Sequence, residues 1–428
     1  MTFSHSRGLV TAGYNDQPDP VRASPQEHAV QYACARFHAN EYSSMRIPFI
    51  LFTLFAFASV VFQQEAYSQQ PPQKLPNVTG SYDLWRAPNT RVVEMQPAAR
   101  PRELRKDLSS DSYAEVRRFA QTAVELPGTT ALALIDKGVL VFEGVGSGKG
   151  VTPQARFASY SMAKSVTALA VGEALCAGKI KDLTDKAEDY APQLKGTPYG
   201  ESAVRDLLMM ASGAKSGTIE SQGHPSPSVG RDIFFGSKSI AEHFSQFKDR
   251  DRTFGGVVRS GTRFAYKNLD TAALAFVIQG AVGMPFQRWT QQMIVEKSGF
   301  ANTSYWHVDK DDQPINFAFF NASLDDWVRL TLRFREILRG ESDEPCLKAF
   351  LASGTRNLLP TFHRAGCSGY GYQIWTDCPF GSRSTFWMLG FGGQRIGIDP
   401  VSDKILIAFA WSPEDQVLTL FDNWNRGK

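Results

Sequence analysis

Three short motifs in this 428-residue chain contain side chains that could carry out covalent chemistry. The first is Ser161-Met162-Ala163-Lys164, in which a hydroxyl and an amine stand three residues apart. Residues at this spacing lie on one face of a helix, so the two groups can come within hydrogen-bonding distance. A serine hydroxyl becomes a good nucleophile when a base takes its proton, and burial lets a lysine be that base because it disfavours the ammonium form. The motif predicts nucleophilic catalysis by Ser161 with Lys164 as its base.

The bare spacing is weak evidence, because a serine followed three residues later by a lysine also begins at Ser212 and at Ser245. Ser212 precedes a glycine in a loop-like run, and Ser245 leads into a charged, solvated stretch. Only Ser161 opens a long apolar helical pattern, which runs from residue 162 to residue 177. The alternative is that Ser161 caps this helix and Lys164 points into solvent.

The second motif is Tyr266-Lys267-Asn268. Residues two apart in an extended segment face the same way, so Tyr266 and Asn268 could both point towards a substrate. A phenol near a lysine can relay a proton to a leaving group, and an amide can orient the lysine and the substrate. The alternative is that Asn268 caps the next helix and Tyr266 packs in the core.

The third motif is Gly390-Phe391-Gly392-Gly393-Gln394, which directly precedes a predicted strand. Glycines beside a strand let a substrate approach the backbone closely, and main-chain N–H groups there can complete an oxyanion hole. The alternative is an ordinary glycine-rich hairpin turn.

Predicted strands lie at both ends of the chain and predicted helices lie between them. A strong hairpin signal covers residues 130–143, with a turn at Asp136-Lys137-Gly138. Helical patterns cover 162–177, 269–278 and 324–338, and strand patterns cover 370–376, 384–389, 394–398 and 405–411. This order predicts an α+β fold, in which an antiparallel sheet formed by both ends is flanked by helices and joined to a helical lobe.

Taken in order, the three motifs resemble those of the serine β-lactamase and penicillin-binding superfamily, in its class C-like branch, from about residue 129 to residue 411. The resemblance implies a β-lactamase/DD-peptidase-like fold. It also implies that Ser161 is the nucleophile, Lys164 the base, Tyr266 a proton relay and Asn268 a polar positioning residue. The N–H groups of Ser161 and Gln394 would form the oxyanion hole.

The third motif departs from the superfamily pattern, in which a lysine or histidine is followed by threonine and glycine. Here Phe391 stands where the cation is usual, followed by Gly392 and Gly393. In true β-lactamases that cation helps to bind the substrate carboxylate, so its replacement counts against penicillin hydrolysis.

Within the branch, Tyr305-Trp306, Asp309 and Asp326-Trp327 look most similar to the 6-aminohexanoate-dimer hydrolase group and related esterases. That group cleaves linear amides and small carboxylic esters. The favoured alternative for the two tryptophans is that they pack in the core.

These features predict a serine hydrolase that cleaves a linear amide or carboxylic ester through a Ser161 acyl-enzyme. One alternative is a β-lactamase or D-Ala-D-Ala carboxypeptidase with the same nucleophile. Another is a catalytically silent protein of this fold that binds cell wall or a partner. No Gly-x-Ser-x-Gly elbow and no metal-ligand spacing of histidines occurs in the sequence, so neither a metal nor another cofactor is expected.

The charge balance favours a small-molecule substrate over nucleic acid. With 46 basic and 43 acidic residues the formal charge is +3, and no basic stripe is interleaved with aromatic residues. We therefore expect no nucleic-acid partner, and the sequence leaves the oligomeric state open.

An apolar run from Ile47 to Phe62 follows Met45-Arg46 and precedes the small-residue site Ala66-Tyr67-Ser68. This pattern is typical of a signal peptide and predicts export to the periplasm or beyond, with no membrane span in the mature chain. The alternative is a membrane anchor formed by the same run. The predicted organisation is a misassigned extension plus signal peptide over 1–68, a linker or arm over 69–110, and the hydrolase domain over 111–428.

Four of the five cysteines lie in the predicted mature chain, and Cys34 lies before it. Export permits disulfides, and a pair among Cys346, Cys367 and Cys378 is open. Cys176 falls in an apolar helical run and is expected to be a buried free thiol. The pair Cys367 and Cys378 is the least favoured, because a strand over 370–376 would hold the two residues apart.

Overall fold

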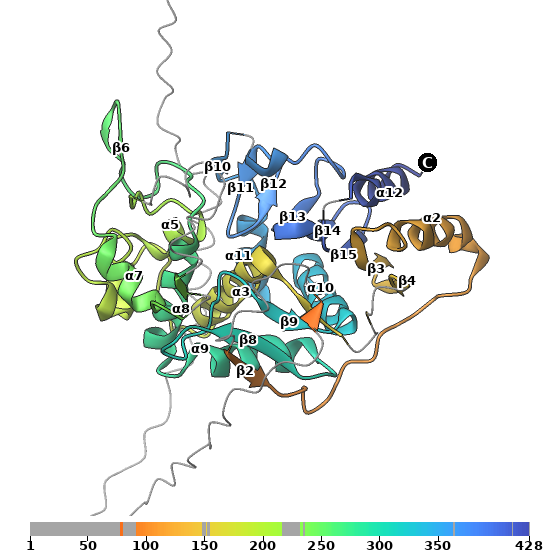
Figure 1. Ribbon diagram of the computed structural model, residues 1–428, viewed down its shortest axis with the longest axis horizontal. Helices are drawn as coiled ribbons and strands as arrows, with labels where there is room; N and C mark the ends of the chain where they lie inside the picture. The colour runs from red at the N-terminus through yellow and green to blue at the C-terminus, as the bar shows by residue number, and fades with distance from the viewer. Residues whose placement is uncertain are drawn as a thin grey trace, which may run out of the picture. The chain divides into compact units, whose positions relative to one another are not determined.

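The computed structural model describes residues 78–79, 91–147, 151, 155–215, 232–233, 236–362, 364–412 and 414–427. The run predicted as a signal peptide and Cys34 lie outside these residues. The described part combines two larger β-sheets with a group of helices (Figure 1).

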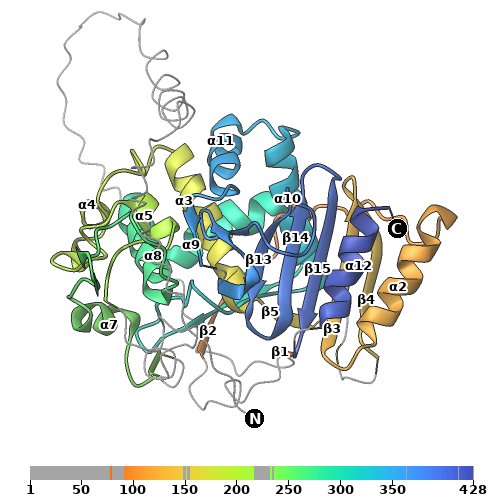
Figure 2. The same ribbon diagram turned by 90° about the horizontal axis from the view of Figure 1, so that it is seen from above.

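The larger sheet has eight strands, and its neighbouring strands all pair antiparallel. In spatial order these are β10 (Leu359–Pro360), β11 (Gly369–Tyr370), β12 (Trp375–Thr376), β13 (Phe386–Gly390), β14 (Gln394–Asp399), β15 (Lys404–Ala410), β3 (Thr129–Asp136) and β4 (Val139–Val145). The pairing of β15 with β3 joins the two ends of the domain, with Ile405 opposite Ile135. Helices α2 (Ala114–Val124) and α12 (Asp415–Asn425) lie together on one face of this sheet (Figure 2). The predicted early hairpin and the predicted pairing of the terminal strands are both confirmed.

The second sheet has five strands, and one of them directly precedes the first motif in the sequence. Its order is β1 (Val78–Thr79), β5 (Arg156–Ala158), β9 (Phe320–Ala322), β8 (Ser304–Val308) and β2 (Arg91–Met95). Strand β2 pairs with β8 from Arg91 opposite Val308 to Met95 opposite Ser304. Part of the segment predicted as an arm is therefore a strand of the folded domain.

The helices are gathered mainly beside the sheets, as expected for a helical lobe. They are α3 (Ala163–Cys176), α4 (Ala187–Tyr190), α5 (Val204–Leu208), α7 (Ile240–Gln246), α8 (Asn268–Val282), α9 (Phe286–Thr290), α10 (Leu324–Arg339) and α11 (Pro345–Gly354). Helix α3 is buried on all sides from Ala163 to Ala174, which agrees with its nearly uninterrupted apolar sequence. Gly172 allows α11 to pack closely, because a Cβ there would lie 2.6 Å from the ring of Phe350.

Among the described helices, no single one is long and apolar enough to span a membrane. Helix α8 and the segment Phe286–Glu296 meet the length and composition criteria only as a pair, bent by 82°.

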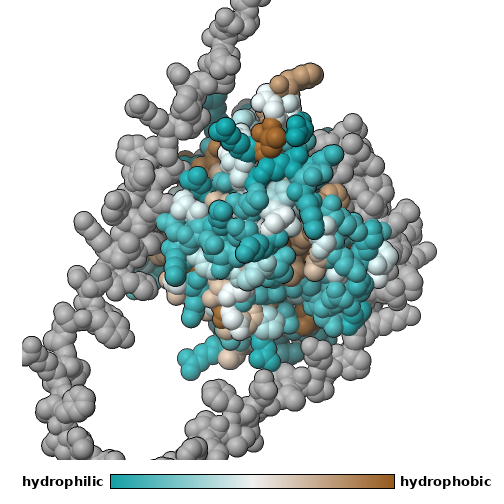
Figure 3. Space-filling view, turned by 90° about the vertical axis from the view of Figure 1, so that its left-hand side faces the viewer, coloured by the Kyte–Doolittle hydropathy of each residue, from teal (hydrophilic) through white to brown (hydrophobic). Residues whose placement is uncertain are grey.

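A short hairpin projects from the helical lobe. It is formed by β6 (Arg252–Thr253) and β7 (Gly256–Val257) and stands clear of the surrounding elements (Figure 1). Seen from that side, hydrophobic side chains rise at the top of the molecule above a largely hydrophilic surface (Figure 3).

The disulfide prediction was wrong for Cys367 and Cys378, which are bonded to each other with Cα atoms 3.9 Å apart. The segment expected to be one strand is two short strands, because the chain turns back between them and Gly369 lies opposite Thr376. The two cysteines therefore flank a hairpin, which brings them together instead of holding them apart.

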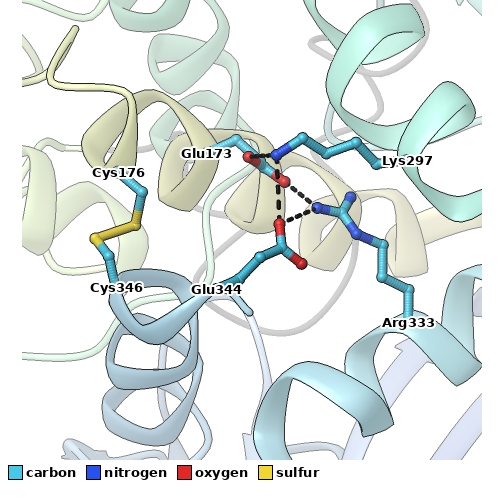
Figure 4. The surroundings of a disulfide bond; sticks show 6 residues. All are labelled: Glu173, Cys176, Lys297, Arg333, Glu344 and Cys346. Carbon is cyan, nitrogen blue, oxygen red and sulfur yellow. Dashed lines mark hydrogen bonds and ion pairs between the residues drawn. A yellow bond between two sulfur atoms is a disulfide. The ribbon is translucent and has the colours of Figure 1, made fainter. Parts of the chain in front are cut away.

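The prediction that Cys176 is a free thiol was also wrong. Cys176 is bonded to Cys346 and joins the end of α3 to the first turn of α11 (Figure 4). Next to the bond, the buried carboxylate of Glu173 accepts hydrogen bonds from Lys297, at 2.7 Å, and from Arg333. The same two cations contact Glu344, at 3.3 and 3.0 Å. Each buried charge thus has an opposite partner, as burial requires.

We expect loss of the Cys176–Cys346 bond to destabilise the protein. The bond closes a segment of 170 residues, whereas Cys367–Cys378 closes one of 11, and the entropic stabilisation grows with the length of the closed loop. Replacing Cys176 and Cys346 together by serine should lower the free energy of unfolding by about 2 to 4 kcal/mol, measured by chemical denaturation. The matched control, with serine at both Cys367 and Cys378, should lower the free energy of unfolding by a smaller amount. Equal stability of the first variant and the wild type, or free thiols mapped to Cys176 and Cys346 in the native protein, would contradict the assignment.

Candidate active site

The structure brings the hydroxyl of Ser161 and the amine of Lys164 into contact. Lys164 Nζ lies 3.0 Å from Ser161 Oγ and donates a second hydrogen bond to the carbonyl oxygen of Phe317, at 2.7 Å. Lys164 is only 1% exposed, whereas Ser161 is partly exposed. A substrate can therefore reach the hydroxyl while the amine stays shielded from water, and the alternative of a solvent-facing Lys164 is wrong.

Ser161 is held on a tight turn between β5 and α3. The turn is a 3₁₀ segment, Tyr160–Met162, and Tyr160 has a φ of +44°, a conformation that non-glycine residues rarely adopt. The preceding Ser159 is fixed to β9, because its N–H donates to Phe320 O at 2.9 Å and its Oγ accepts from Phe320 N at 3.0 Å. The sheet therefore holds the unusual turn that presents Ser161.

The carbonyl group that binds Lys164 is itself held in place. The neighbouring Asn316 is fully buried. Its main-chain carbonyl accepts a hydrogen bond from Thr167 Oγ1 at 2.8 Å, and its side-chain Nδ2 donates one to Thr271 O at 2.6 Å. The segment of Asn316 and Phe317 is thus tied to both α3 and α8. The sequence motifs gave no indication of this segment.

Gln373 is a second positioning residue that the motifs did not reveal. Its amide donates to the carbonyls of Leu207 and Leu208, both at 2.9 Å. Its carbonyl groups accept from Thr271 Oγ1 at 2.8 Å and, on the main chain, from Ser165 Oγ at 2.7 Å. This buried glutamine, with a φ of +57°, joins α5, α8 and α3 near Ser161 and Lys164. The only sequence signal was a polar residue in a run of apolar ones.

Tyr266 lies beside the amine of Lys164, whose Nζ is 5.0 Å from the centre of the phenol ring. The ring stacks on Trp375, with centroids 5.5 Å apart, and also contacts Tyr370 and Phe264. Tyr266 therefore packs among aromatic residues, as the alternative held, and is also next to the predicted base. Its proton-relay role remains a prediction.

Asn268 is partly exposed and is the first residue of α8, so it does not occupy the capping position that the alternative assigned to it. The capping position is taken by Lys267, whose side chain makes no capping hydrogen bond. Asn268 follows Tyr266 at the same end of α8, and its positioning role remains a prediction.

The third motif lies directly against the turn that carries Ser161. A Cβ on Gly390 would overlap the carbonyl oxygen of Ser159, so only glycine fits this contact. The ring of Phe391 lies 5.9 Å from that of Tyr160 and is 58% exposed. Gly392 and Gly393 have φ values of +76° and +96°, which glycine adopts without strain. The predicted neighbourhood of this motif and Ser161 is confirmed.

The side chain of Gln394 has a structural function. Its Nε2 donates to Phe391 O at 2.8 Å and to Ala410 O at 2.7 Å, and its Oε1 accepts from Ala410 N at 2.9 Å. These bonds fix the end of β14 to β15 and hold the glycine turn. The predicted oxyanion role therefore concerns the main-chain N–H of Gln394 alone.

The two other serines of the same spacing are not activated in this way. Ser212 is buried and its hydroxyl lies 2.7 Å from Asp270 Oδ1, while its N–H donates to Asp270 Oδ2 at 3.1 Å. Ser245 lies exposed on α7. The lysines that follow them, Lys215 and Lys248, are exposed. Of the three serines, only Ser161 lies within hydrogen-bonding distance of the lysine that follows it in the described structure.

Asp270 and Lys267 are both buried at the start of α8. Both are at most 2% exposed. Burial raises the pKa of the Asp270 carboxyl, and the nearby ammonium of Lys267 and the hydrogen bonds from Ser212 oppose that rise. Asp270 ties the start of α8 to the loop at Ser212 through these hydrogen bonds, close to the backbone that carries Tyr266.

The residues that suggested the 6-aminohexanoate-dimer hydrolase group lie mainly in the interior. Trp306 and Trp327 are fully buried, which confirms the core interpretation. Asp309 accepts N–H groups of Ile240 at 2.7 Å and of Asp311 at 2.9 Å, and Asp326 pairs with Arg329 at 3.0 Å. Tyr305 is partly buried on β8.

Comparison with known proteins decides the family. The family model described as Beta-lactamase matches residues 116–424. The chain belongs to the Beta-lactamase family. Its fold is the β-lactamase-like α+β fold, as predicted, and the family is one of serine hydrolases.

Solved structures of this fold include proteins with several activities. A protein from Bacillus anthracis assigned as a 6-aminohexanoate-dimer hydrolase has a TM-score of 0.61 and 20% identity, over 83% of this chain and 95% of that one. A penicillin-binding protein homologue from Pyrococcus abyssi, octameric in its structure, has a TM-score of 0.58 and 20% identity, over 74% and 78%. EstCE1, a hydrolase with promiscuous acyltransferase activity, has a TM-score of 0.56 and 15% identity, over 73% and 97%. At these identities the likeness is one of fold.

We expect the protein to lose stability in acid through His307, which lies buried on β8. Burial lowers the pKa of His307 from 6.5 to about 3. A histidine with a lowered folded pKa favours the unfolded state once the pH falls below 6.5, and the loss continues down to the folded pKa. His307→Gln removes this titration. The wild type should therefore lose stability relative to the variant by up to about 1.4 kcal/mol per pH unit between pH 6.5 and pH 3, measured by denaturant unfolding. A stability difference that stays constant between neutral and acidic pH would refute this.

Proposed function

We propose that this protein is an exported serine hydrolase that cleaves a linear amide or carboxylic ester through an acyl-enzyme on Ser161. The observation that carries the proposal is the 3.0 Å contact between Ser161 Oγ and Lys164 Nζ, with the amine buried and the hydroxyl partly exposed. A silent binding protein would not need this pairing. Family membership adds support, because the family consists of serine hydrolases.

In the proposed acylation, Ser161 Oγ attacks the substrate carbonyl carbon as its proton passes to Lys164 Nζ. Phe317 O accepts a hydrogen bond from the amine and so directs the nitrogen lone pair towards Ser161. The developing oxyanion is stabilised by the main-chain N–H groups of Ser161 and Gln394.

Collapse of the tetrahedral intermediate breaks the bond from the acyl carbon to the leaving oxygen or nitrogen. That atom takes a proton relayed from Lys164 through Tyr266, and Asn268 orients the amine and the substrate. A water molecule then hydrolyses the Ser161 ester by the reverse sequence of proton transfers, which releases the carboxylic acid.

The third motif favours a substrate without a carboxylate at this position. Phe391 presents a largely exposed aromatic ring beside the nucleophile turn, where the superfamily pattern has a cation. An aromatic ring gains from contact with apolar groups but offers no ionic partner for a carboxylate. This supports linear, neutral amides and esters over penicillins as substrates.

Two disulfides in the described part of the chain support export. Disulfides form and persist in oxidising compartments and are rare in the cytosol. This agrees with the signal peptide predicted from the apolar run at 47–62.

The experiment that tests the proposal is mass analysis of the native protein after exposure to a nitrophenyl ester, a linear amide dimer and a penicillin. We expect an acyl adduct on the peptide that contains Ser161 with the ester or amide, and no adduct and no hydrolysis in Ser161→Ala. The untreated mass should place the amino terminus near Gln69. Full hydrolysis by a folded Ser161→Ala variant would remove the mechanism. Labelling by penicillin alone would favour the β-lactamase or carboxypeptidase alternative, and an intact Met1 would oppose cleavage of the signal.

A further inference from the structure

The tip of the β6–β7 hairpin exposes a large aromatic side chain to solvent. Phe254 is 115% exposed, the highest value among the exposed large hydrophobic residues of the described chain, and Val257, opposite Arg252 in the hairpin, is 47% exposed. An exposed phenylalanine forgoes the favourable free energy that burying its ring would give. A tip that only faced water would therefore favour a polar residue. Figure 3 shows hydrophobic side chains projecting at the top of the molecule above a largely hydrophilic surface.

The base of this hairpin is firmly attached to the lobe. Val258 N donates to Asp251 O at 2.9 Å, and Asp251 N donates to Gly213 O at 2.8 Å. Lys215 N donates to Asp249 O at 2.8 Å. Gly213 makes this contact possible, because a Cβ there would lie 2.6 Å from the carbonyl oxygen of Val258. The structure thus holds Phe254 outward on a fixed support.

The segment that carries the tip is basic. Four exposed cations flank Phe254 in the sequence: Lys248, Arg252, Arg259 and Arg263. Asp249 is the one exposed acid between residues 248 and 263. The other acid there, Asp251, is partly buried and accepts the N–H of Arg252 at 2.9 Å. Arg250 is paired with Glu201, at 2.7 Å, so it adds little free positive charge.

We propose that the β6–β7 hairpin docks this protein on an anionic lipid surface. One aromatic ring and one valine are too little apolar surface for a stable protein interface, which buries about 800 Å² on each partner. The same elements suit a bilayer, because the ring enters the boundary between headgroups and acyl chains while the surrounding arginines and lysine attract anionic headgroups. The positive charges of Lys248, Arg252, Arg259 and Arg263 favour a negatively charged surface over a neutral one.

Binding of the purified full chain to vesicles tests this proposal. We expect hydrogen exchange over residues 248–263 to slow when phosphatidylcholine vesicles containing phosphatidylglycerol are added, and not with phosphatidylcholine alone. High salt should reverse the effect, because it screens the exposed charges. Exchange is measured at the hairpin so that lipid contact elsewhere in the chain does not enter the result. Phe254→Ser should raise the lipid concentration that gives half-maximal protection of the hairpin by about tenfold.

The matched control is Phe362→Ser, which removes another exposed phenylalanine, 75% exposed, and should leave the protection unchanged. Phe254→Ser should also keep the wild-type rate with a soluble nitrophenyl ester, because the hairpin tip takes no part in the chemistry. Unchanged exchange at the hairpin with anionic vesicles, or equal protection in Phe254→Ser, would overturn the proposal. A wild-type dimer that Phe254→Ser converts to a monomer in light scattering would overturn it too, by assigning the tip to a second copy of the chain.

Discussion

The contact between a buried amine and a partly exposed hydroxyl is the interaction on which the catalytic interpretation depends. Removing an ammonium group from water costs several kcal/mol. The rings of Tyr266 and Phe317 lie 5.0 and 5.6 Å from Lys164 Nζ and favour the cation, and each such contact contributes about 2 kcal/mol or more when desolvated. Two hydrogen-bond partners of this amine, the Ser161 hydroxyl and the Phe317 carbonyl, are neutral. The catalytic interpretation requires that burial disfavours the ammonium form, so that the amine can accept the Ser161 proton.

Much of the surrounding structure keeps this contact in place. The second sheet fixes Ser159 and so the strained turn at Tyr160. Asn316 and Gln373 tie the loops on the other side of α3 to α5 and α8. At the far end of the same helix, Glu173 and the bond from Cys176 fasten α3 to α10 and α11. The catalytic helix is thus anchored at both ends, which allows a buried polar pair to keep one geometry.

Sequence patterns predicted the elements in which local preference and burial agree. The hairpin of β3 and β4 has alternating residues and a turn glycine, and α3, α8 and α10 have long apolar or amphipathic patterns. The three motifs were also placed correctly beside one another, through their resemblance to a known superfamily. In each of these cases the signal lies within a short window of the chain.

The features that escaped prediction depend on contacts between distant segments or on single backbone conformations. The strand expected over 370–376 is broken by a turn at Gln373, whose positive φ has no signature in a non-glycine residue. That turn is also what brings Cys367 to Cys378. Cys176 meets Cys346 across 170 residues, and Gln373 acts through three helices that are far apart in the chain. No local pattern reports such pairings.

The acylation rate of Lys164→Ala measures the central claim most directly. Because the variant keeps Ser161, the oxyanion donors and the binding surface, its single-turnover rate with a nitrophenyl ester isolates the contribution of the amine. The account predicts a fall of at least about two orders of magnitude, as is typical for the loss of a general base, in a protein that unfolds like the wild type. An acylation rate equal to that of the wild type would contradict the account, since the base would then have to be another group.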